Sequence, residues 1–400
     1  MKSPALAVSS PLSGYSFVVR CAIAAIIAGL AIGGGGCASG KPAVKPDPAT
    51  KPPTKTAASP EFDFPVNHDD WSALGYRLDW VGYPFEKSAK TRVVAAAAFP
   101  DALILQDSSS EVALLDSLTG ERRWGVGLAN PLTRFVGIVR DPLDKGRVVV
   151  SSQSEGFVMA VATGGLVAKE SYEKVVNTKP LVVGGMLVFG TSTGEVLAHL
   201  MGRNVKAWGF QTGSGIDVNP VLFNDGVIGS ISQSGDVVIL NRSGQMLGRN
   251  RVLGGLANNP VTDGNYLFAA STDQSVWAFT QSGGLLWRYR TAASLTGQIA
   301  VHAGAVYVFV PRDGMTALES TTGKVLWTAK DVEGDVIAVV AGKLLVRTPK
   351  GIDAIDPVNG AVTRRVAMPG VVRFIPESMK DPTMYAVSDL GVVAKFIPRQ

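Results

Sequence analysis

Apolar runs separated by short polar turns recur along most of this chain. Val188 to Gly190 is one apolar run, Thr191 to Gly194 is a polar turn, and a second apolar run follows. Short alternating runs of this kind are typical of β-hairpins, and no segment shows sustained helical periodicity. The pattern occurs eight times, starting near Leu103, Val148, Val188, Val227, Leu267, Val306, Leu344 and Met384. Eight copies predict eight repeats of one hairpin-based unit.

A second repeated phrase consists of a turn containing Gly and a strand that ends in Trp. Its clearest copy runs from Leu318 to Trp327, where Thr322-Gly323 suits a tight turn because Gly reaches positive φ without steric cost. Asp116 to Trp124 and Thr280 to Trp287 are further copies. Two degenerate copies lack the Trp and lie at Asn241 to Leu247 and at Asp356 to Val362.

The spacing of these phrases defines the repeat. Trp208, Trp287 and Trp327 are separated by 79 and 40 residues, so the period is near 40. A period near 40 with four short strands per unit is typical of a β-propeller blade. We therefore predict an all-β, eight-bladed propeller of four-stranded antiparallel blades over residues 76–400. Pro180, Pro220 and other prolines open inner strands, a position that needs no ladder donor.

A count of strands predicts how the ring closes. The last blade supplies three strands after residue 370, and residues 76–83 form a spare strand with Trp80 at the place where outer strands carry Trp. Two unpaired edges would leave backbone N–H and C=O groups unsatisfied. We therefore expect residues 76–83 to pair with residues 391–397 and to close the ring.

The N-terminal region reads as a targeting segment and a tether. Residues 1–36 carry Lys2, Arg20 and the apolar run from Cys21 to Ile32, which has the length of a signal-peptide core. Cys37 follows at the place of a bacterial lipoprotein's lipidated cysteine; an ordinary cleaved signal with a chance cysteine is the alternative. Residues 37–75 include a segment rich in Pro, Lys and Ala and are expected to be an irregular tether.

Charge and cysteine content narrow the classes of function. The formal charge is +5, but the leader and tether account for it, and residues 61–400 hold 32 basic and 32 acidic side chains. A neutral domain gives no electrostatic case for binding nucleic acid. Cys21 and Cys37 are the only cysteines, so the domain forms no internal disulfide.

Two motifs associated with catalysis have simpler explanations. Gly190 to Gly194 matches G-x-S-x-G, but that motif requires a following helix and here a strand is expected. Ser171 to Lys174 matches S-x-x-K without its companion motifs. His68, His199 and His302 are not spaced as metal ligands, and no Asp-rich loop fits a calcium site. We expect no catalytic, cofactor-binding or metal-binding residues.

The tryptophans at the ends of outer strands allow two interpretations. Aromatic rings can stack on a sugar or cofactor, or they can pack between neighbouring blades. Their fixed place in the repeat favours packing. These structural repeat residues are Trp80, Trp124, Trp208, Trp287 and Trp327.

The repeated strand–Thr-Gly–strand–Trp phrase resembles the PQQ-like propeller repeat over about residues 76–400. With eight blades and a lipoprotein-type leader, the chain is similar to the outer-membrane assembly lipoproteins of that family. The resemblance implies a protein-binding scaffold on the periplasmic side of the outer membrane. Its partner would be the machinery that assembles β-barrel proteins. The fold by itself serves both enzymes and scaffolds.

The sequence is compatible with two other functions. One is a sensor or ligand-binding propeller of unknown specificity. The other, which we rank last, is a dehydrogenase that uses pyrroloquinoline quinone (PQQ) and calcium. Resemblance to those enzymes implies a vicinal disulfide and acidic and amide calcium ligands near the axis. The chain has no paired cysteines and no recognisable ligand set.

Overall fold

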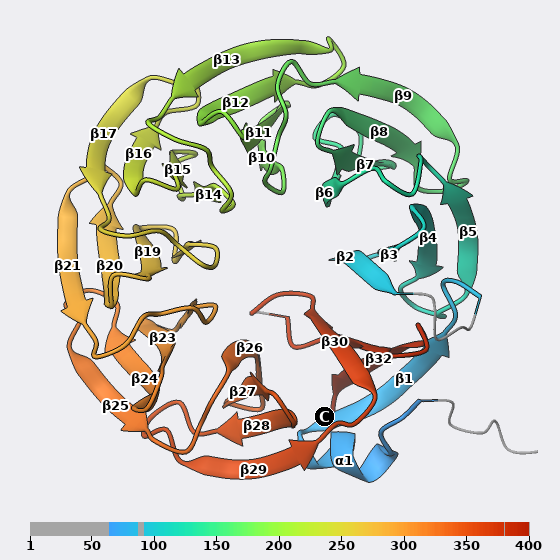
Figure 1. Cartoon of the computed structure of the whole chain (residues 1–400). Helices are drawn as coiled ribbons and strands as arrows, with labels where there is room; N and C mark the ends of the chain where they lie inside the picture. The colour runs from blue at the N-terminus through green and yellow to red at the C-terminus, as the bar shows by residue number, and fades with distance from the viewer. Residues whose placement is uncertain (1–63, 87–91, 380, 400) are drawn as a thin grey trace, which may run out of the picture. The chain divides into compact units, whose positions relative to one another are not determined.

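The computed structural model describes residues 64–86, 92–379 and 381–399. These residues form eight four-stranded antiparallel sheets, arranged as blades around a central channel (Figure 1). The predicted all-β, eight-bladed propeller is therefore confirmed. Seven blades are continuous in sequence, and the eighth is completed from the two ends of the described chain.

The strands occupy four positions in each blade, from the channel outward. The innermost strands are β2 (Val93–Phe99), β6 (Phe135–Arg140), β10 (Leu181–Val183), β14 (Val221–Leu222), β18 (Val261–Thr262), β22 (Ala300–His302), β26 (Asp335–Val340) and β30 (Val371–Pro376). The second strands are β3 (Ala102–Asp107), β7 (Arg147–Ser152), β11 (Met186–Gly190), β15 (Ile228–Ile231), β19 (Tyr266–Ser271), β23 (Ala305–Val310), β27 (Lys343–Thr348) and β31 (Met384–Ser388).

The outer two positions complete the blades, which we number 1 to 8 in the order of their innermost strands. The third strands are β4 (Glu111–Asp116), β8 (Glu155–Ala160), β12 (Glu195–Leu200), β16 (Asp236–Leu240), β20 (Ser275–Thr280), β24 (Gly314–Glu319), β28 (Gly351–Ile355) and β32 (Val393–Pro398). The outermost strands are β5 (Arg122–Gly127), β9 (Leu166–Ser171), β13 (Val205–Gln211), β17 (Met246–Arg251), β21 (Leu285–Arg290), β25 (Val325–Ala329), β29 (Val362–Ala367) and β1 (Tyr76–Gly82).

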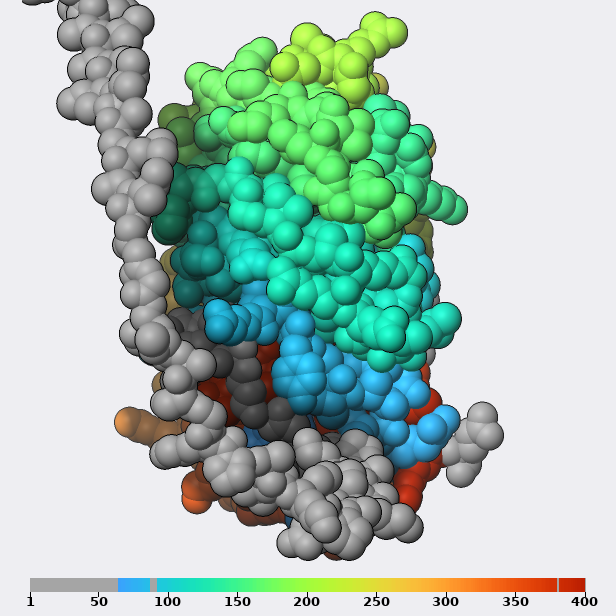
Figure 2. Space-filling model, turned by 90° about the vertical axis from the view of Figure 1, so that its right-hand side faces the viewer, coloured from blue at the N-terminus to red at the C-terminus, as the bar shows by residue number. Residues whose placement is uncertain are grey.

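Antiparallel order gives the ring two different faces. The connections between blades and the turns between second and third strands lie on one side, which we call the link face. The turns between first and second strands and between third and fourth strands lie on the other, which we call the hairpin face. Seen from its side, the ring presents its first blades, coloured blue to green, one after another along the rim (Figure 2).

Burial follows position within a blade. Every residue of the second strand β3 is buried, because both of its faces pack against neighbouring blades. The outermost strand β13 instead alternates between exposed and half-buried residues, since one of its faces meets solvent. The core is therefore divided into apolar layers between successive blades, such as the one that joins Leu114 of β4 to Phe157 of β8.

The ring closes as the strand count predicts. Strand β1 pairs antiparallel with β32, with Tyr76 opposite Pro398 and Gly82 opposite Val393. Lys395 of β32 is buried, and its Nζ lies 2.9 Å from Asp79 Oδ2 and 2.7 Å from the Ser117 carbonyl oxygen of blade 1. The closing pair of strands is thus fixed to the next blade by a charged hydrogen bond as well as by its own ladder.

The expected tether differs from the structure at its C-terminal end. Residues 64–75 belong to the packed domain, where the short helix α1 (His68–Ala73) covers the last blade. Trp71 is fully buried and stacks on Phe396 with ring centroids 3.5 Å apart. Asn67 caps the helix through the Asp70 N–H at 2.9 Å. A six-residue helix has too few turns to show apolar periodicity, so the sequence pattern missed it.

The leader, Cys37 and the first part of the expected tether lie outside the described residues. Within the parts that the structure describes, no helix is long and apolar enough to cross a bilayer.

Candidate functional site

Five tryptophans of the outermost strands contact the next blade in the same way. Each indole Nε1–H donates to a carbonyl in the hairpin between the third and fourth strands of that blade. The five distances are 2.7–3.0 Å, from Trp80 to Ser117, Trp124 to Val161, Trp208 to Arg242, Trp287 to Ser320 and Trp327 to Pro357. These rings therefore serve contacts between blades.

A glycine in the same hairpin lies directly against each ring. In the Trp287 contact it is Gly323, which has a φ of 71°. A Cβ there would lie 2.7 Å from two ring atoms, so a side chain is excluded by space as well as by backbone conformation. The equivalent glycines are Gly120, Gly164, Gly244 and Gly360. The Thr-Gly–strand–Trp phrase of the sequence is thus one contact shared between two neighbouring repeats.

Blade 2 uses a different contact, because Ala168 stands at its tryptophan position. Here His199 Nε2 of blade 3 lies 2.9 Å from Glu170 Oε2, and both side chains are almost fully buried. The Gly202 N–H donates to Glu170 Oε1 at 3.0 Å. The Tyr172 ring packs edge-on against His199, with centroids 5.2 Å apart. No motif in the sequence indicates this buried polar pair, since its members are 29 residues apart.

The residues of the two catalysis-associated motifs and the three histidines do not form a common site. Ser192 lies in the turn between β11 and β12, so a strand follows G-x-S-x-G and no helix does. Ser171 ends β9 and Lys174 is an exposed residue of the next link. His68 belongs to α1, and His302 lies on β22 at the channel, so the three histidines are not brought together. Within the described ranges, no group of His, Cys, Asp and Glu side chains fits a metal ion.

The starts of the innermost strands are joined from blade to blade on the link face. The Lys179 N–H donates to Asn219 Oδ1 at 2.9 Å, and the Asn219 N–H donates to Asn259 Oδ1 at 2.8 Å. Further round, the Gln298 N–H donates to Asp335 Oδ1 at 2.9 Å. These bonds pair backbone N–H groups of the links, which would otherwise be left without an acceptor at the mouth of the channel. They hold the loops of this face in fixed relative positions.

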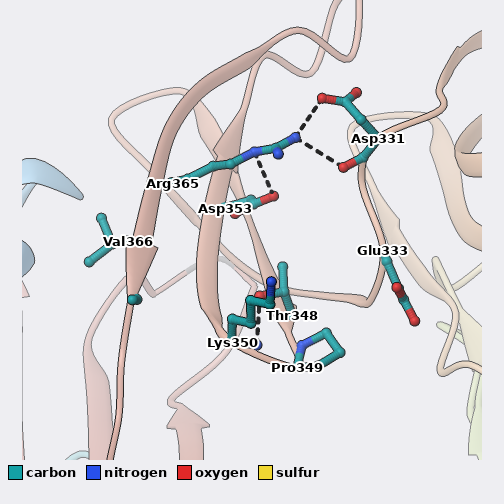
Figure 3. Close-up of a pocket in the computed structure, with 9 residues that line it drawn as sticks. Asp331, Glu333, Thr348, Pro349, Lys350, Asp353, Arg365 and Val366 are labelled. Carbon is teal, nitrogen blue, oxygen red and sulfur yellow. Dashed lines mark hydrogen bonds and ion pairs between the residues drawn. The ribbon is translucent and has the colours of Figure 1, made fainter.

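A cavity of about 500 Å³ opens on the link face between blades 6 and 7 (Figure 3). Arg365 of β29 lies between two carboxylates, with Nη2 at 2.5 Å from Asp331 Oδ2 and Nε at 3.4 Å from Asp353 Oδ2. Burial raises the pKa of Asp353; the Arg365 charge opposes this shift and the Asp331 charge adds to it. Glu333 and Lys350 line the same cavity and make no ion pair among the described residues.

The central channel holds two further cavities. The larger, about 780 Å³, is lined mainly by apolar side chains of blades 4 to 7 and by Met379, with Gln298 and His302 among its polar groups. The smaller, about 360 Å³, is bounded by blades 1, 2, 3 and 8 and contains Lys179. Burial of the Lys179 ammonium among protein atoms lowers its pKa, although the residue as a whole is exposed.

Comparison with known proteins gives a family and a fold. The family model described as "Outer membrane protein assembly factor BamB" matches residues 77–208 and 233–372. No curated protein matches the chain. The crystal structure of BamB from Moraxella catarrhalis is 18% identical, with a TM-score of 0.63, and the alignment covers 81% of this chain and 98% of that one.

Two other solved structures show that this architecture is shared more widely. The computationally designed Ika8 protein is 14% identical with a TM-score of 0.62, over 78% of this chain and 98% of that chain. Sqt1 of Saccharomyces cerevisiae is 12% identical with a TM-score of 0.62, over 80% of this chain and 100% of that chain. At such identities the likeness concerns the fold alone.

Proposed function

Because this chain belongs to the PQQ-repeat propeller family of the outer membrane protein assembly factor BamB, we propose that it is a protein-binding scaffold for the assembly of outer-membrane β-barrel proteins. The observation that carries the proposal is the family match over two segments that together extend from residue 77 to residue 372. The closed ring supports it, because hydrogen-bonded links between blades present the face loops in a preorganised arrangement. Preorganised loops lose little entropy when a partner binds.

The proposed location is the periplasmic side of the outer membrane, with lipid on Cys37 as the anchor. Cys37 lies outside the described residues, so the support comes from the sequence. It follows an apolar run of signal-peptide length and precedes the Pro- and Lys-rich segment. Such a tether would let the ring reach a membrane-embedded partner while its own domain stays in water.

The experiment that tests this function is an affinity pull-down of the tagged full-length chain from solubilised membranes, with the untagged chain as control. Recovery of a component of the barrel-assembly machinery is the expected result. Reproducible recovery of a different complex, with no component of that machinery, would overturn the proposal.

We further propose that the chain is not an enzyme and takes no cofactor. The only two cysteines, Cys21 and Cys37, are 16 residues apart, so the chain has no vicinal pair of the kind that resemblance to the quinoprotein dehydrogenases implies. The expected result of titration with pyrroloquinoline quinone and calcium, followed by calorimetry, is no saturable heat. Tight stoichiometric binding would contradict this part of the proposal.

A ligand-binding propeller is the second candidate function, and one observation favours it. The larger channel cavity has the volume and the mainly apolar walls of a small-molecule site, with a few polar groups such as Gln298 and His302. If this candidate were correct, a copurifying small molecule would be released on denaturation and detected by mass spectrometry. The pull-down would then recover no stable protein partner.

A further inference from the structure

Three neighbouring cavities on the link face share lining residues, and we call the three together the blade 6–8 groove. The first cavity, between blades 6 and 7, shares Glu333 and Lys350 with a second cavity of about 400 Å³. The second shares Val372 with a third cavity of about 490 Å³ that reaches Arg92 before blade 1. The groove therefore runs from the outer strand of blade 7 to the inner strand of blade 8.

The outer end of the groove is acidic. Asp331, Glu333 and Asp353 line it against Arg365 and Lys350. The positive charge of Arg365 is already shared between Asp331 and Asp353, as Figure 3 shows. Glu333 and Lys350 both lack an ion-pair partner within the described ranges. Glu333 is the only one of the three carboxylates that Arg365 does not engage, so it is the one left to receive a cation from a partner.

The middle of the groove combines apolar side chains with the ion pair between Asp335 and Arg347. Phe309, Met368, Val371 and Phe374 contribute to the wall of the second cavity. Val372 is 61% exposed and lines both the second and third cavities. An exposed valine between two cavities leaves apolar surface in water, which a partner's side chains could cover.

The inner end is basic. Arg373 and Arg92 line the third cavity together with one carboxylate, Asp389. Arg373 donates to the Val94 carbonyl oxygen at 3.0 Å and forms no ion pair with any described carboxylate. Burial, and then the positive charge of Arg347, lower the pKa of Arg373, so cationic groups repel one another here. A negative group would relieve that repulsion.

We propose that the blade 6–8 groove binds an extended polypeptide segment that carries a basic residue at the outer end, apolar residues in the middle and an acidic residue at the inner end. This deepens the proposed scaffold function, on which it rests, by assigning one binding surface and the chemistry of its occupant. Separated charges and a row of open cavities suit a chain molecule, whereas a small ligand is usually buried within one concave pocket. Charge complementarity at both ends would fix the placement of the segment.

The test measures binding of short fluorescent peptides to the full-length protein in detergent by anisotropy. The peptides alternate valine and threonine and differ only at their ends, which carry one lysine and one glutamate, two lysines or two glutamates. The expected result is that the mixed peptide binds about fivefold to tenfold more tightly than either like-charged peptide. Equal affinity for all three peptides would overturn the proposal.

Charge-reversal variants test which end of the groove binds the basic residue of the peptide and which binds the acidic one. Glu333→Lys is expected to shift the preference to the peptide with two glutamates, and Arg373→Glu to the peptide with two lysines. Arg373→Gln, which keeps a donor for the Val94 carbonyl, should weaken the mixed peptide without a new preference. The matched control is Arg251→Glu on blade 4, where Arg251 also donates to a link-face carbonyl, that of Ser234. An unchanged preference in both reversal variants, or the same change in the control, would exclude the groove.

The pull-down separates this proposal from the scaffold function. If the peptides follow the expected preferences but no assembly component is recovered, the groove stands and the proposed function fails. If components are recovered equally with the wild-type and the Glu333→Lys chain, and the peptides show no preference, the function stands and the groove is wrong.

Discussion

Each tryptophan of the outermost strands makes one hydrogen bond and one close ring contact across a blade boundary. Trp287 is buried and donates to the Ser320 carbonyl while its ring covers Gly323. At residue scale this contact combines the burial of a large aromatic surface with satisfaction of a hairpin carbonyl. Removal of either part should therefore be measurable separately.

We predict that Trp287→Ala lowers the free energy of unfolding by about 3–5 kcal/mol, because it leaves a cavity and an unpaired carbonyl. Trp287→Phe should cost about 1–2 kcal/mol, mostly for the lost hydrogen bond. Leu285→Ala is the matched control: it lies on the same strand, is half exposed and should change stability by less than about 1 kcal/mol. Urea denaturation followed by circular dichroism measures all three. Coincident curves for Trp287→Ala and Leu285→Ala would refute the prediction.

The buried Glu170–His199 pair gives a second prediction at this scale. Glu170→Ala removes the acceptor of both His199 and the Gly202 N–H, so it should destabilise the domain by about 3–5 kcal/mol. The comparison is Arg249→Ala, which breaks the surface pair with Asp236 and should cost less than about 1 kcal/mol. Denaturant midpoints in one buffer give both values. Equal costs would show that burial of the pair does not matter.

At the scale of elements, β1 and α1 are the parts that convert an open array into a ring. Strand β1 covers the edge of β32, and α1 places Trp71 over the last blade's core. Without them, the N–H and C=O groups of β32 would face solvent as an open edge. Propeller stability should therefore depend on the N-terminal residues far more than the short length of these elements suggests.

We predict that removal of residues 64–82 lowers the free energy of unfolding by at least about 5 kcal/mol and promotes aggregation. It exposes a strand edge and removes the buried side chains of Trp71, Tyr76 and Trp80. Removal of residues 38–60 is the control and should leave the melting temperature within about 2 °C. Differential scanning calorimetry with light scattering checks both variants. Similar melts for the two truncations would show that β1 does not close the ring energetically.

At the scale of the whole molecule, the proposed anchor decides where the propeller works. We predict that Cys37→Ser moves the protein from the membrane fraction to the soluble fraction, because stable anchoring needs more than one acyl chain on the modified cysteine. Cys21→Ser, with its change inside the apolar run, is the control and should leave the mature protein with membranes. Fractionation in high salt followed by blotting measures both. Membrane retention of Cys37→Ser would disprove lipid anchoring at this residue.

The whole ring also shows how much of the fold could be predicted. The period near 40, the Thr-Gly turns and the spare strand ending in Trp80 led to eight blades and to the β1–β32 pairing, both of which are confirmed. The packing of residues 64–75 could not be predicted, because it depends on contacts distant in the chain, such as the stack of Trp71 on Phe396, 325 positions away. No repeat marks such a contact in the sequence.

The residues that line the blade 6–8 groove could not be predicted from the sequence. Glu333, Val372 and Arg373 carry no motif, and they come from the link before blade 7 and the inner strand of blade 8. Their juxtaposition depends on how the ring places successive links beside one another. The Glu170–His199 pair could not be predicted either, since it carries no motif and lies at one of the blade boundaries that lack a tryptophan.

By itself, the sequence determined the properties that depend on nearby residues and on repetition: glycine turns, the number of blades and the tryptophan positions. Alternating burial and positive φ are local requirements, so the residues that satisfy them recur in each repeat. The tertiary structure alone decided which side chains meet across blades: the buried pair, the helix on the last blade and the charged ends of the groove. These contacts join residues that are distant in the chain. Such residues become neighbours only when the ring is closed, so their burial and their charge pairing depend on the tertiary structure.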